Sequence, residues 1–290
     1  MNTVDLHTHT TASDGLFSPT ELVRRAKEAG LHTIAVADHD TSDGLAEALE
    51  AGHTYGVQVI PAVEINTDVP GTEVHVLGYL PDYQQPAFQS VLTTLRDARA
   101  LRGQRMVEKL NALGIPVRWE RVREIAGGSV GRPHVAQALL ELGVVTTIGE
   151  AFDRYIGRNG PAYVPRYKLT PEDAARFISS VRGVPVLAHP WGLPNLEGWI
   201  PRLKEAGVAG IEVYYGDYSD EVVEALAALA RHFGLIATGG SDYHGPGIHP
   251  TPLGGRYVPP EAVDQLQAEA EARRQHPAPA FELPPPEEEK

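Results

Sequence analysis

The chain has 290 residues, enough to bury a substantial core as one large domain or as one domain with an insertion. Its formal net charge of −13 disfavours a broad electrostatic grip on nucleic acid or an anionic membrane, although a local cationic pocket remains compatible with that charge. Because the chain has no cysteine, disulfides and thiolate ligands are excluded, and any metal must be bound through nitrogen and oxygen, which favours Mn, Fe, Zn or Mg.

The first predicted element is a strand that carries closely spaced metal-binding side chains. Side chains alternate along a strand, so His7 and His9 project from the same face and can bind one ion between them. Asp14 follows in a turn indicated by residues 13–15, which could return its carboxylate to the same ion or to a neighbouring one. The alternative is a polar strand with its histidines in solvent, but further histidine clusters downstream favour a metal site.

After this strand, predicted helices alternate with short apolar strands. The capping pattern at residues 18–21 predicts a helix over residues 22–29. The same pattern at residues 170–173 predicts one over residues 174–181. The apolar, β-branched runs typical of strands buried on both faces are 33–37, 57–60, 185–188, 210–213 and 235–238. This alternation implies a parallel sheet, and the number of units favours a closed or nearly closed barrel over an open doubly wound sheet.

The segment between the two halves of the barrel is predominantly helical. Residues 88–113 predict a long helix, and further helices are expected over 134–142 and 148–155. We therefore expect a four-part organisation of the chain. Its parts are residues 1–84 and 165–274 as the barrel, 85–164 as an inserted helical subdomain that acts as a lid, and the proline- and glutamate-rich 275–290 as a disordered tail.

The lid contains a candidate anion-binding point. Arg132 and His134 lie at the start of a predicted helix, with Pro133 as a suitable first helical residue and free N–H groups that favour an anion. Arg132 would bind a phosphate in a bidentate manner. The alternative is that Arg132 forms a surface ion pair and His134 only caps the helix. Arg158 is a second candidate of the same kind.

Polar side chains occur at the strands of the predicted barrel. Enzymes with barrel folds bind their ligands at the carboxyl ends of the strands, where these side chains are expected to meet. Each one alone could have an ordinary role, such as a helix cap for His39 or a solvent-facing strand histidine for His75. Their joint occurrence predicts a site. The side chains are His39, Glu64, His75, His189, Asp242 and His244.

Other polar residues have weaker signals. Asp5 and Asp38 are adjacent to predicted ligands in the sequence, and we interpret them as acceptors that orient imidazoles. No spacing argument assigns a role to Glu212 in its strand, and His249 is at most a loop contact.

These motifs resemble those of the polymerase and histidinol phosphatase (PHP) superfamily of metal-dependent phosphoesterases. Within the superfamily, residues 131–136 and 162–165 look like the branch of 3′,5′-nucleoside bisphosphate phosphatases, some of whose members also shorten RNA oligonucleotides from the 5′ end. The resemblance covers residues 1–80 and 165–250. It is carried by Asp5-Leu6-His7-Thr8-His9 with residues 13–15, by residues 38–41 and 63–65, by His75, and by residues 188–190 and 240–244.

The resemblance implies an α/β fold, a distorted barrel of seven strands, with a trinuclear site of divalent ions. Mn is the expected metal, with Fe or Zn as alternatives. One ion would be bound by His7, His9, Glu64 and Asp242. A second would share Glu64, whose two oxygens can bridge, and would also take His75 and His189. The third would be bound by Asp14, His39 and His244. His189 and Asp242 are also expected to act in catalysis.

The activity implied by this resemblance is metal-assisted hydrolysis of a phosphate monoester. A water activated by the ions would attack phosphorus in line. The expected substrate is the 3′-phosphate of a nucleoside 3′,5′-bisphosphate, with Arg132 and His134 holding the other phosphate. Degradation of 5′-phosphorylated oligoribonucleotides from the 5′ end is a further expected activity, so that the expected partners are a small phosphorylated nucleotide and short RNA or DNA oligonucleotides.

Three other functions are compatible with parts of the pattern. A histidinol-phosphate phosphatase would share the metals but would not need a second phosphate contact. An amidohydrolase also uses a His-x-His strand, although a third ion and an anion-binding lid would be superfluous for it. A non-enzymatic PHP interaction module is the remaining alternative. No basic region followed by an apolar core begins the chain and no apolar run approaches the ~20 residues of a spanning helix, so we expect a soluble cytoplasmic protein with no membrane partner.

Overall fold

The computed structural model describes residues 3–69, 72–127, 130–164 and 169–284, and the chain divides into two compact units. The barrel unit comprises Met1–Val91 and Lys168–Pro285, and the helical unit is built on Leu92–Tyr167. The division falls inside helix α3 (Pro86–Ala112). Within the described ranges, no helix is both long enough and apolar enough to cross a membrane.

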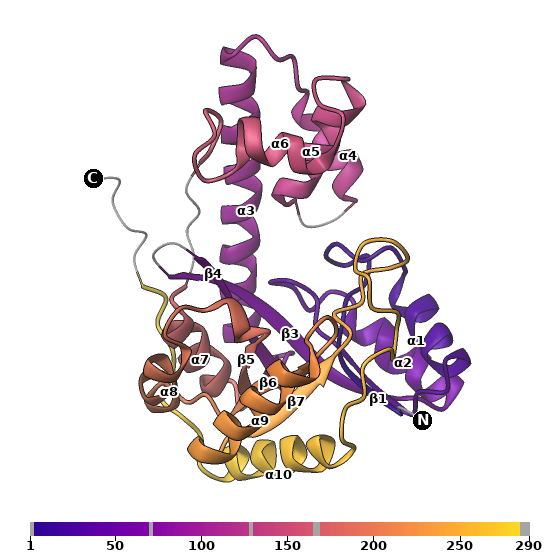
Figure 1. Ribbon diagram of the computed structural model, residues 1–290, viewed down its shortest axis with the longest axis vertical. Coiled ribbons are helices and arrows are strands. Elements are labelled where there is room, and N and C mark those ends of the chain that lie inside the picture. The colour runs from indigo at the N-terminus through magenta and orange to yellow at the C-terminus, as the bar shows by residue number, and fades with distance from the viewer. Residues whose placement is uncertain (1–2, 70–71, 128–129, 165–168, 285–290) are drawn as a thin grey trace. The chain divides into compact units, whose positions relative to one another are not determined.

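The barrel unit is built around one sheet of seven strands (Figure 1). Their order in the sheet is their order in the chain: β1 (Val4–Thr8), β2 (Thr33–Val36), β3 (Gln58–Val69), β4 (Thr72–Tyr79), β5 (Val184–Ala188), β6 (Gly210–Tyr215) and β7 (Ile236–Gly240). The two edge strands, β1 and β7, meet through backbone hydrogen bonds at their carboxyl ends. The N–H of His9 donates to the carbonyl of Tyr243 at 2.9 Å, and the N–H of Tyr243 donates to the carbonyl of His7 at 3.3 Å. The predicted α/β fold with a nearly closed barrel is confirmed.

Strand β4 departs from the predicted parallel arrangement. It runs antiparallel to both β3 and β5, whereas the other neighbouring strands are parallel. The prediction of a wholly parallel sheet is therefore wrong. Only residues 70 and 71 separate β3 from β4, and a connection this short cannot make the crossover that parallel strands require. As a result, His75 lies opposite Ala188, the last residue of β5, and so reaches the carboxyl end of the parallel strands.

Two of the helices around the sheet begin at the predicted capping residues. The Ser18 side chain accepts a hydrogen bond from the N–H of Glu21 at the start of α1 (Pro19–Glu28), and Thr170 accepts one from Asp173 at the start of α7 (Pro171–Ser180). The remaining helices of this unit are α2 (Leu45–Tyr55), α8 (Leu196–Glu205), α9 (Asp220–Phe233), α10 (Glu261–Gln275) and the short 3₁₀ helix η2 (Pro190–Gly192).

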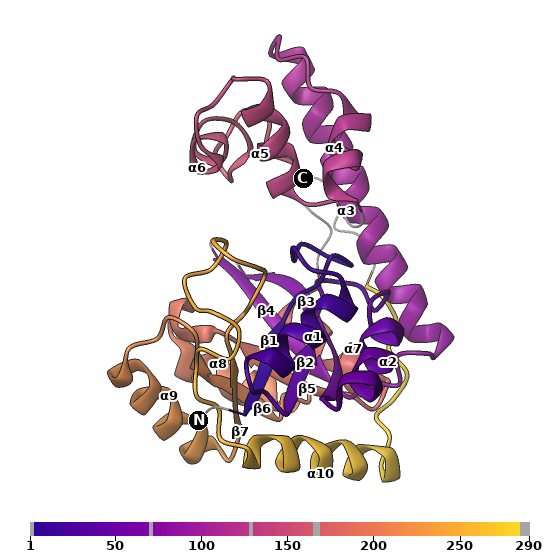
Figure 2. The ribbon, with the colours of Figure 1, turned by 90° about the vertical axis from the view of Figure 1, so that its right-hand side faces the viewer.

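Helix α10 closes the end of the barrel at which β1 and β5 begin. Its buried Leu266 packs in one cluster with Val4 and Val184, the first residues of those strands. Figures 1 and 2 both show α10 lying across that end. Burial of each such aliphatic side chain stabilises the fold by about 1.5–3 kcal/mol. The apolar core therefore occupies this end, and polar side chains are left to the other end.

The helical unit has its own core. It contains most of α3, α4 (Trp119–Ala126), α5 (Arg132–Glu141), α6 (Ile148–Ala151) and the π-helical turn η1 (Phe152–Ile156). These elements lie close to the predicted helices, except for α4, which was not predicted. Leu110, Val135 and Leu139 are buried together. Arg102 of α3 is also buried, and its Nε donates to the carbonyl of Val164 at 2.7 Å, so it stabilises the unit internally.

The predicted tail is only partly covered by the described residues. Gln275 is the last residue of α10, and residues 276–284 form no helix or strand. The Phe281 ring lies 5.7 Å from that of Phe177 in α7, centroid to centroid. Residues 285–290 lie outside the described residues, and disorder of the tail stays a prediction.

Candidate metal centre

The nine predicted ligands gather in the barrel unit, at the end of the sheet opposite to α10. We call these nine side chains the ligand cluster. His7 and His9 leave the end of β1, and the Nε2 atom of each lies 3.3 Å from Oε2 of Glu64. The same two nitrogens lie 3.3 and 3.1 Å from Oδ1 of Asp242. All four side chains are buried and offer ligand atoms within 4.8 Å of one another, an arrangement that could hold one ion.

The second oxygen of Glu64 faces another pair of histidines. Oε1 lies 2.8 Å from Nδ1 of His75 and 3.1 Å from Nε2 of His189. Glu64 lies inside β3, which continues to Val69, and not at a strand end, where the side chains of the site were expected. Its carboxylate therefore stands between two groups of imidazoles, as a bridging ligand would.

A third group forms around Asp14. Its Oδ1 lies 3.2 Å from Nε2 of His244, and its Oδ2 lies 3.7 Å from Nε2 of His39. These residues and His9 also offer ligand atoms within 4.8 Å of one another. His39 reaches Glu64 as well, with Nδ1 at 3.0 Å from Oε2, and so connects this group with the previous ones.

Unsatisfied polar atoms show that the ligand cluster fits a metal. Among the described residues, six buried ligand atoms of the cluster have no hydrogen-bond partner. Buried polar groups normally have partners, and leaving one without costs about 1–3 kcal/mol. Cations bound by nitrogen and oxygen would satisfy five of them, because two of the six belong to His9 and a neutral imidazole offers only one nitrogen to a metal. The atoms are Nε2 of His7, Nδ1 and Nε2 of His9, Oε2 of Glu64, Nε2 of His75 and Oδ1 of Asp242.

The charges in the ligand cluster oppose the cost of burial. Burial alone would raise the pKa of Glu64, but the neighbouring histidines, His39 and His7 foremost, hold it well below its usual range. Burial alone would lower the pKa of His7, but the carboxylates around it, Asp242 first, raise it well above 6.5. In the absence of metal, protons on imidazoles thus neutralise ionised carboxylates, and a divalent cation can replace those protons.

Glu212 contacts two of the predicted ligands, although sequence reasoning assigned it no role. It is fully buried in β6, its Oε1 lies 3.0 Å from Nδ1 of His7, and its Oε2 accepts the N–H of His189 at 2.8 Å. With Nδ1 of His7 directed at Glu212, Nε2 is turned toward the other ligands. The one sequence signal was a charged residue inside an otherwise apolar strand.

Asp5 and Asp38 do not orient imidazoles, so that interpretation is wrong. Asp5 accepts hydrogen bonds from the N–H and Oγ of Ser241, at 2.9 and 2.6 Å, and from the N–H of Gly254 at 2.8 Å. Asp38 accepts from the N–H of Thr10 at 2.8 Å and from Oγ of Ser13 at 2.6 Å. Both carboxylates hold the loops that carry the ligands, rather than the ligands themselves.

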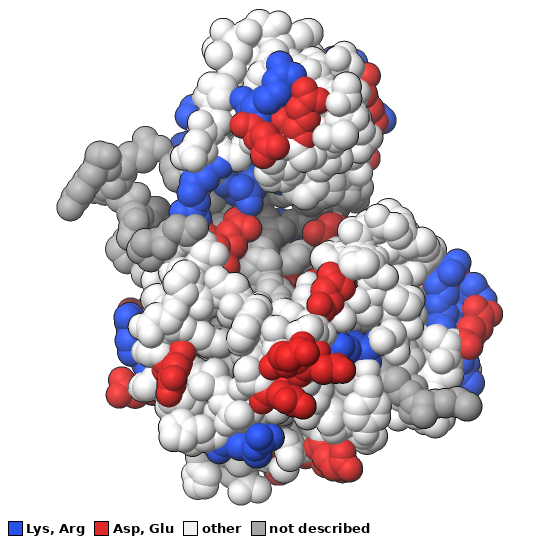
Figure 3. Space-filling model, viewed as in Figure 1, with Lys and Arg blue, Asp and Glu red and all other residues white. Residues whose placement is uncertain are grey.

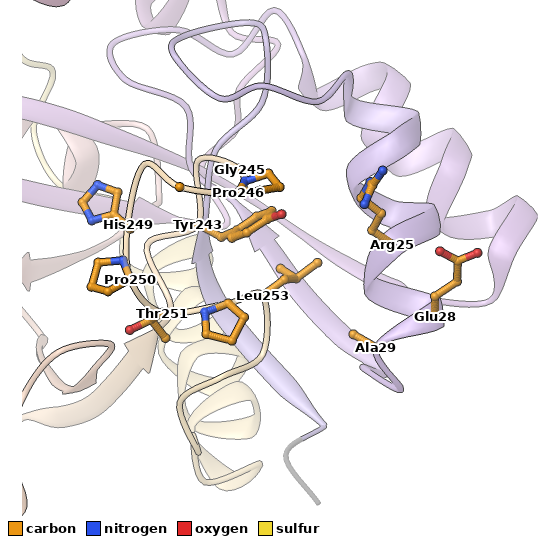
Figure 4. A pocket seen from close by; sticks show the side chains of 12 residues that line it. Arg25, Glu28, Ala29, Tyr243, Gly245, Pro246, His249, Pro250, Thr251 and Leu253 are labelled. Atoms are coloured by element: carbon orange, nitrogen blue, oxygen red, sulfur yellow. The ribbon is translucent and has the colours of Figure 1, made fainter.

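His249 also lies nearer to the ligand cluster than the sequence indicated. Its Nε2 is 4.0 Å from Oδ2 of Asp242, and its ring stacks on that of His244 with centroids 4.8 Å apart. It borders a cavity of about 370 Å³ between α1 and residues 243–253. Figure 4 shows His249 on one side of this cavity and Arg25 and Glu28 of α1 on the other. His249, Asp242 and His244 form a further group of possible ligands.

The predicted anion-binding residues belong to the helical unit. Nδ1 of His134 accepts the N–H of Gly131 at 2.9 Å, so this side chain caps α5. The Arg132 guanidinium lies over the Phe152 ring, 5.4 Å from its centroid. Arg158 is exposed. On the face seen in Figure 3, the described acidic and basic side chains of each unit form small separate groups.

Comparison with known proteins agrees with the motifs. A model of the PHP domain matches residues 5–117. The chain is 35% identical over 246 residues to a 5′-3′ exoribonuclease of Haemophilus influenzae, covering 83% of this chain and 90% of the relative. It is 33% identical over 288 residues to a 3′,5′-nucleoside bisphosphate phosphatase of Chromobacterium violaceum, covering 96% and 100%. A Bifidobacterium adolescentis crystal structure, described as a candidate metal-dependent phosphoesterase, aligns with a TM-score of 0.83 and 32% identity over 92% of this chain and 96% of that one. This chain belongs to the PHP family and is a metal-dependent phosphoesterase.

Proposed function

We propose that this enzyme removes the 3′-phosphate of nucleoside 3′,5′-bisphosphates at a centre of three divalent ions. The observation that carries the proposal is the ligand cluster around Glu64, whose carboxylate faces imidazoles on both sides. Mn is the proposed metal, with Fe or Zn as alternatives, because each of these ions accepts a site built only from nitrogen and oxygen donors. The Chromobacterium violaceum relative, similar over its whole length, supports the choice of substrate.

The ligand cluster divides into three proposed ion sites. The first consists of His7, His9, Glu64 and Asp242, the second of Glu64, His75 and His189, and the third of Asp14, His39 and His244. When bound, the ions would supply an activated water and neutralise negative charge on the phosphoryl oxygens.

The residues of the chain set the geometry of this reaction. Glu212 fixes the ring of His7 and the backbone of His189, and the hydroxyl of Tyr215 donates to Oδ2 of Asp242 at 3.0 Å. The His189 side chain is 25% exposed, whereas those of His7 and His9 are fully buried. The reacting phosphate is therefore proposed to approach from the side of His189, with His189 and Asp242 as the catalytic pair that adjoins it.

Arg132 is proposed to bind the second phosphate. A guanidinium at a helix N-terminus combines bidentate donors with free backbone N–H groups. His134 would contribute by fixing the first turn of α5, where it already accepts the N–H of Gly131. Arg158 is a weaker candidate for the same role.

A comparison of substrates tests both proposals. Arg132→Ala should lower kcat/KM for adenosine 3′,5′-bisphosphate by about 10- to 100-fold, as expected for a lost charge-assisted contact, and should change it little for adenosine 3′-monophosphate. Arg123→Ala, at an exposed arginine of α4, is the matched control for loss of a cation in the same unit. Equal losses on both substrates would assign Arg132 to the reacting phosphate, and no loss on either would remove it from the site.

Metal analysis tests the number of ions. Reconstituted protein should bind three equivalents of Mn, and His39→Ala should lose one of them while the barrel stays folded. A content of one equivalent or fewer after saturating reconstitution would contradict the trinuclear proposal. An unchanged content and turnover in His39→Ala would mean that His39 is only structural.

A second candidate activity is 5′-3′ exoribonuclease action. The observation that favours it is the Haemophilus influenzae relative, which matches over 90% of its length. Incubation of the Mn-loaded enzyme with 5′-phosphorylated oligoribonucleotides should release mononucleotides from the 5′ end. Activity on histidinol phosphate that exceeds activity on every nucleotide would instead favour the simpler phosphatase.

A further inference from the structure

The loop after β5 carries an exposed tryptophan two residues after a predicted ligand. Trp191 lies in η2, two residues after His189, and is 51% exposed, whereas Pro190 and Leu193 on either side of it are buried. Single exposed apolar side chains are common on protein surfaces, so exposure alone assigns no role. What distinguishes Trp191 is its position next to a ligand and the way in which its loop is held.

Hydrogen bonds at two points hold this loop. The backbone of His189 has a φ of 27°, which is unfavourable for a residue with a side chain, and its N–H is bound by Oε2 of Glu212. The N–H of Trp191 donates to the hydroxyl of Tyr218 at 2.9 Å. The Tyr218 ring contacts that of Tyr215, with centroids 5.0 Å apart, and Tyr215 donates to Asp242. The backbone that carries the indole is therefore fixed relative to two ligands.

Two more exposed apolar side chains lie on loops that carry ligands. Leu16 follows Asp14, and its N–H donates to the carbonyl of His244 at 2.7 Å. Ile248 precedes His249. The loops that follow β1, β5 and β7 thus each carry one exposed large apolar side chain close in sequence to a predicted ligand. This pattern suits a ligand that has an apolar part as well as a phosphate.

We propose that Trp191 is a stacking platform for the nucleobase of the substrate. The proposal rests on the proposed nucleotide substrate and adds a determinant of its selection. In a nucleotide, one sugar separates the phosphate from a flat base, and two residues of chain span at most about 7 Å, so a base can reach Trp191 while its phosphate contacts the ligand cluster. Stacking on an aromatic ring accepts any base, because every base has a π-face. Trp191 thus selects nucleotides over sugar phosphates without selecting among bases.

Kinetics with and without a base test this proposal. Trp191→Ala should raise KM for adenosine 3′,5′-bisphosphate by about 5- to 100-fold, the range expected for one lost base stack, with kcat little changed. Glycerol phosphate, which has no base, should show an unchanged KM. Trp191→Phe should restore most of the affinity because it keeps an aromatic face. Tyr257→Ala removes another exposed aromatic residue, between β7 and α10, and serves as the matched control.

The outcomes separate this inference from the proposed function. A wild-type enzyme that hydrolyses both substrates with no preference for the base would overturn the nucleotide substrate and the stacking role together. If Trp191→Ala still preferred adenosine 3′,5′-bisphosphate over glycerol phosphate as strongly as the wild-type enzyme, the stacking role alone would be overturned. Equal losses on both substrates would show that Trp191 supports the His189 loop, which also overturns the proposal.

Discussion

Replacement of Glu212 by glutamine perturbs the ligand cluster without touching a proposed ligand. The two side chains have nearly the same shape, so the packing of β6 is kept. In the native protein the Glu212 carboxylate accepts hydrogen bonds from two groups. Its Oε1 lies 3.0 Å from Nδ1 of His7, and its Oε2 lies 2.8 Å from the backbone nitrogen of His189. Glutamine has one acceptor oxygen, so its NH₂ must face an N–H donor at one of these positions.

The magnitude follows from burial and charge. Glu212 is fully buried, so water cannot replace the lost partner. Loss of a hydrogen bond to a charged group costs about 1.5–3 kcal/mol, and the free energy of unfolding should fall by that amount in the metal-free protein. A lost orienting partner of a metal-ligating histidine lowers metal affinity by about 10- to 100-fold, and Mn binding should weaken accordingly.

Urea denaturation of the metal-free protein and calorimetric titration with Mn measure the two effects separately. Glu224→Gln, at an exposed glutamate of α9, is the control for loss of one negative charge. If Glu212→Gln kept both its stability and its Mn affinity, the contacts of Glu212 with His7 and His189 would have no orienting role. A loss of stability alone would reduce Glu212 to a structural residue.

Two further predictions concern pH and packing. Burial lowers the pKa of His7, His9 and His189, but nearby carboxylates outweigh it and raise the pKa of each above 6.5. The protonated forms of these groups stabilise the metal-free fold, and this stabilisation is complete below pH 6.5. It is lost as the pH rises through the raised folded-state pKa values, so the urea midpoint of the metal-free protein should fall as the pH rises above 6.5. Because Mn must displace the same protons, it should raise Tm more at about pH 8 than at about pH 6, and an equal rise at both would contradict the protonated cluster. Gly240→Ala should destabilise the fold by about 1–3 kcal/mol, since the new Cβ would meet the backbone nitrogen and Cβ of His7. Gly192→Ala, where a Cβ meets nothing within 4 Å, is its control, and equal Tm losses in the two variants would show that the approach of β7 to β1 is not tight.

Local sequence determined most of the secondary structure. Ser18 before Pro19, and Thr170 before Pro171, began helices as predicted, because a hydroxyl that accepts an N–H and a proline in the first turn act within one turn of chain. The apolar, β-branched runs became buried strands for a similar reason, since they suit a strand covered on both faces. Residue type and spacing also pointed to the side chains that the structure brings together in the ligand cluster.

Only the tertiary structure decided how these elements meet. The reversal of β4 depends on a two-residue connection, and it brings His75 to the end of β5. Periodicity predicts that Glu212 lies in a strand, but not which nitrogen faces it, because His7 is distant in sequence and becomes its neighbour only through barrel closure. The same holds for Asp5, whose partners Ser241 and Gly254 come from the other end of the chain. The sequence pattern indicates whether a residue is buried, lies in a turn or must have a polar partner. Which residue is that partner depends on long-range packing.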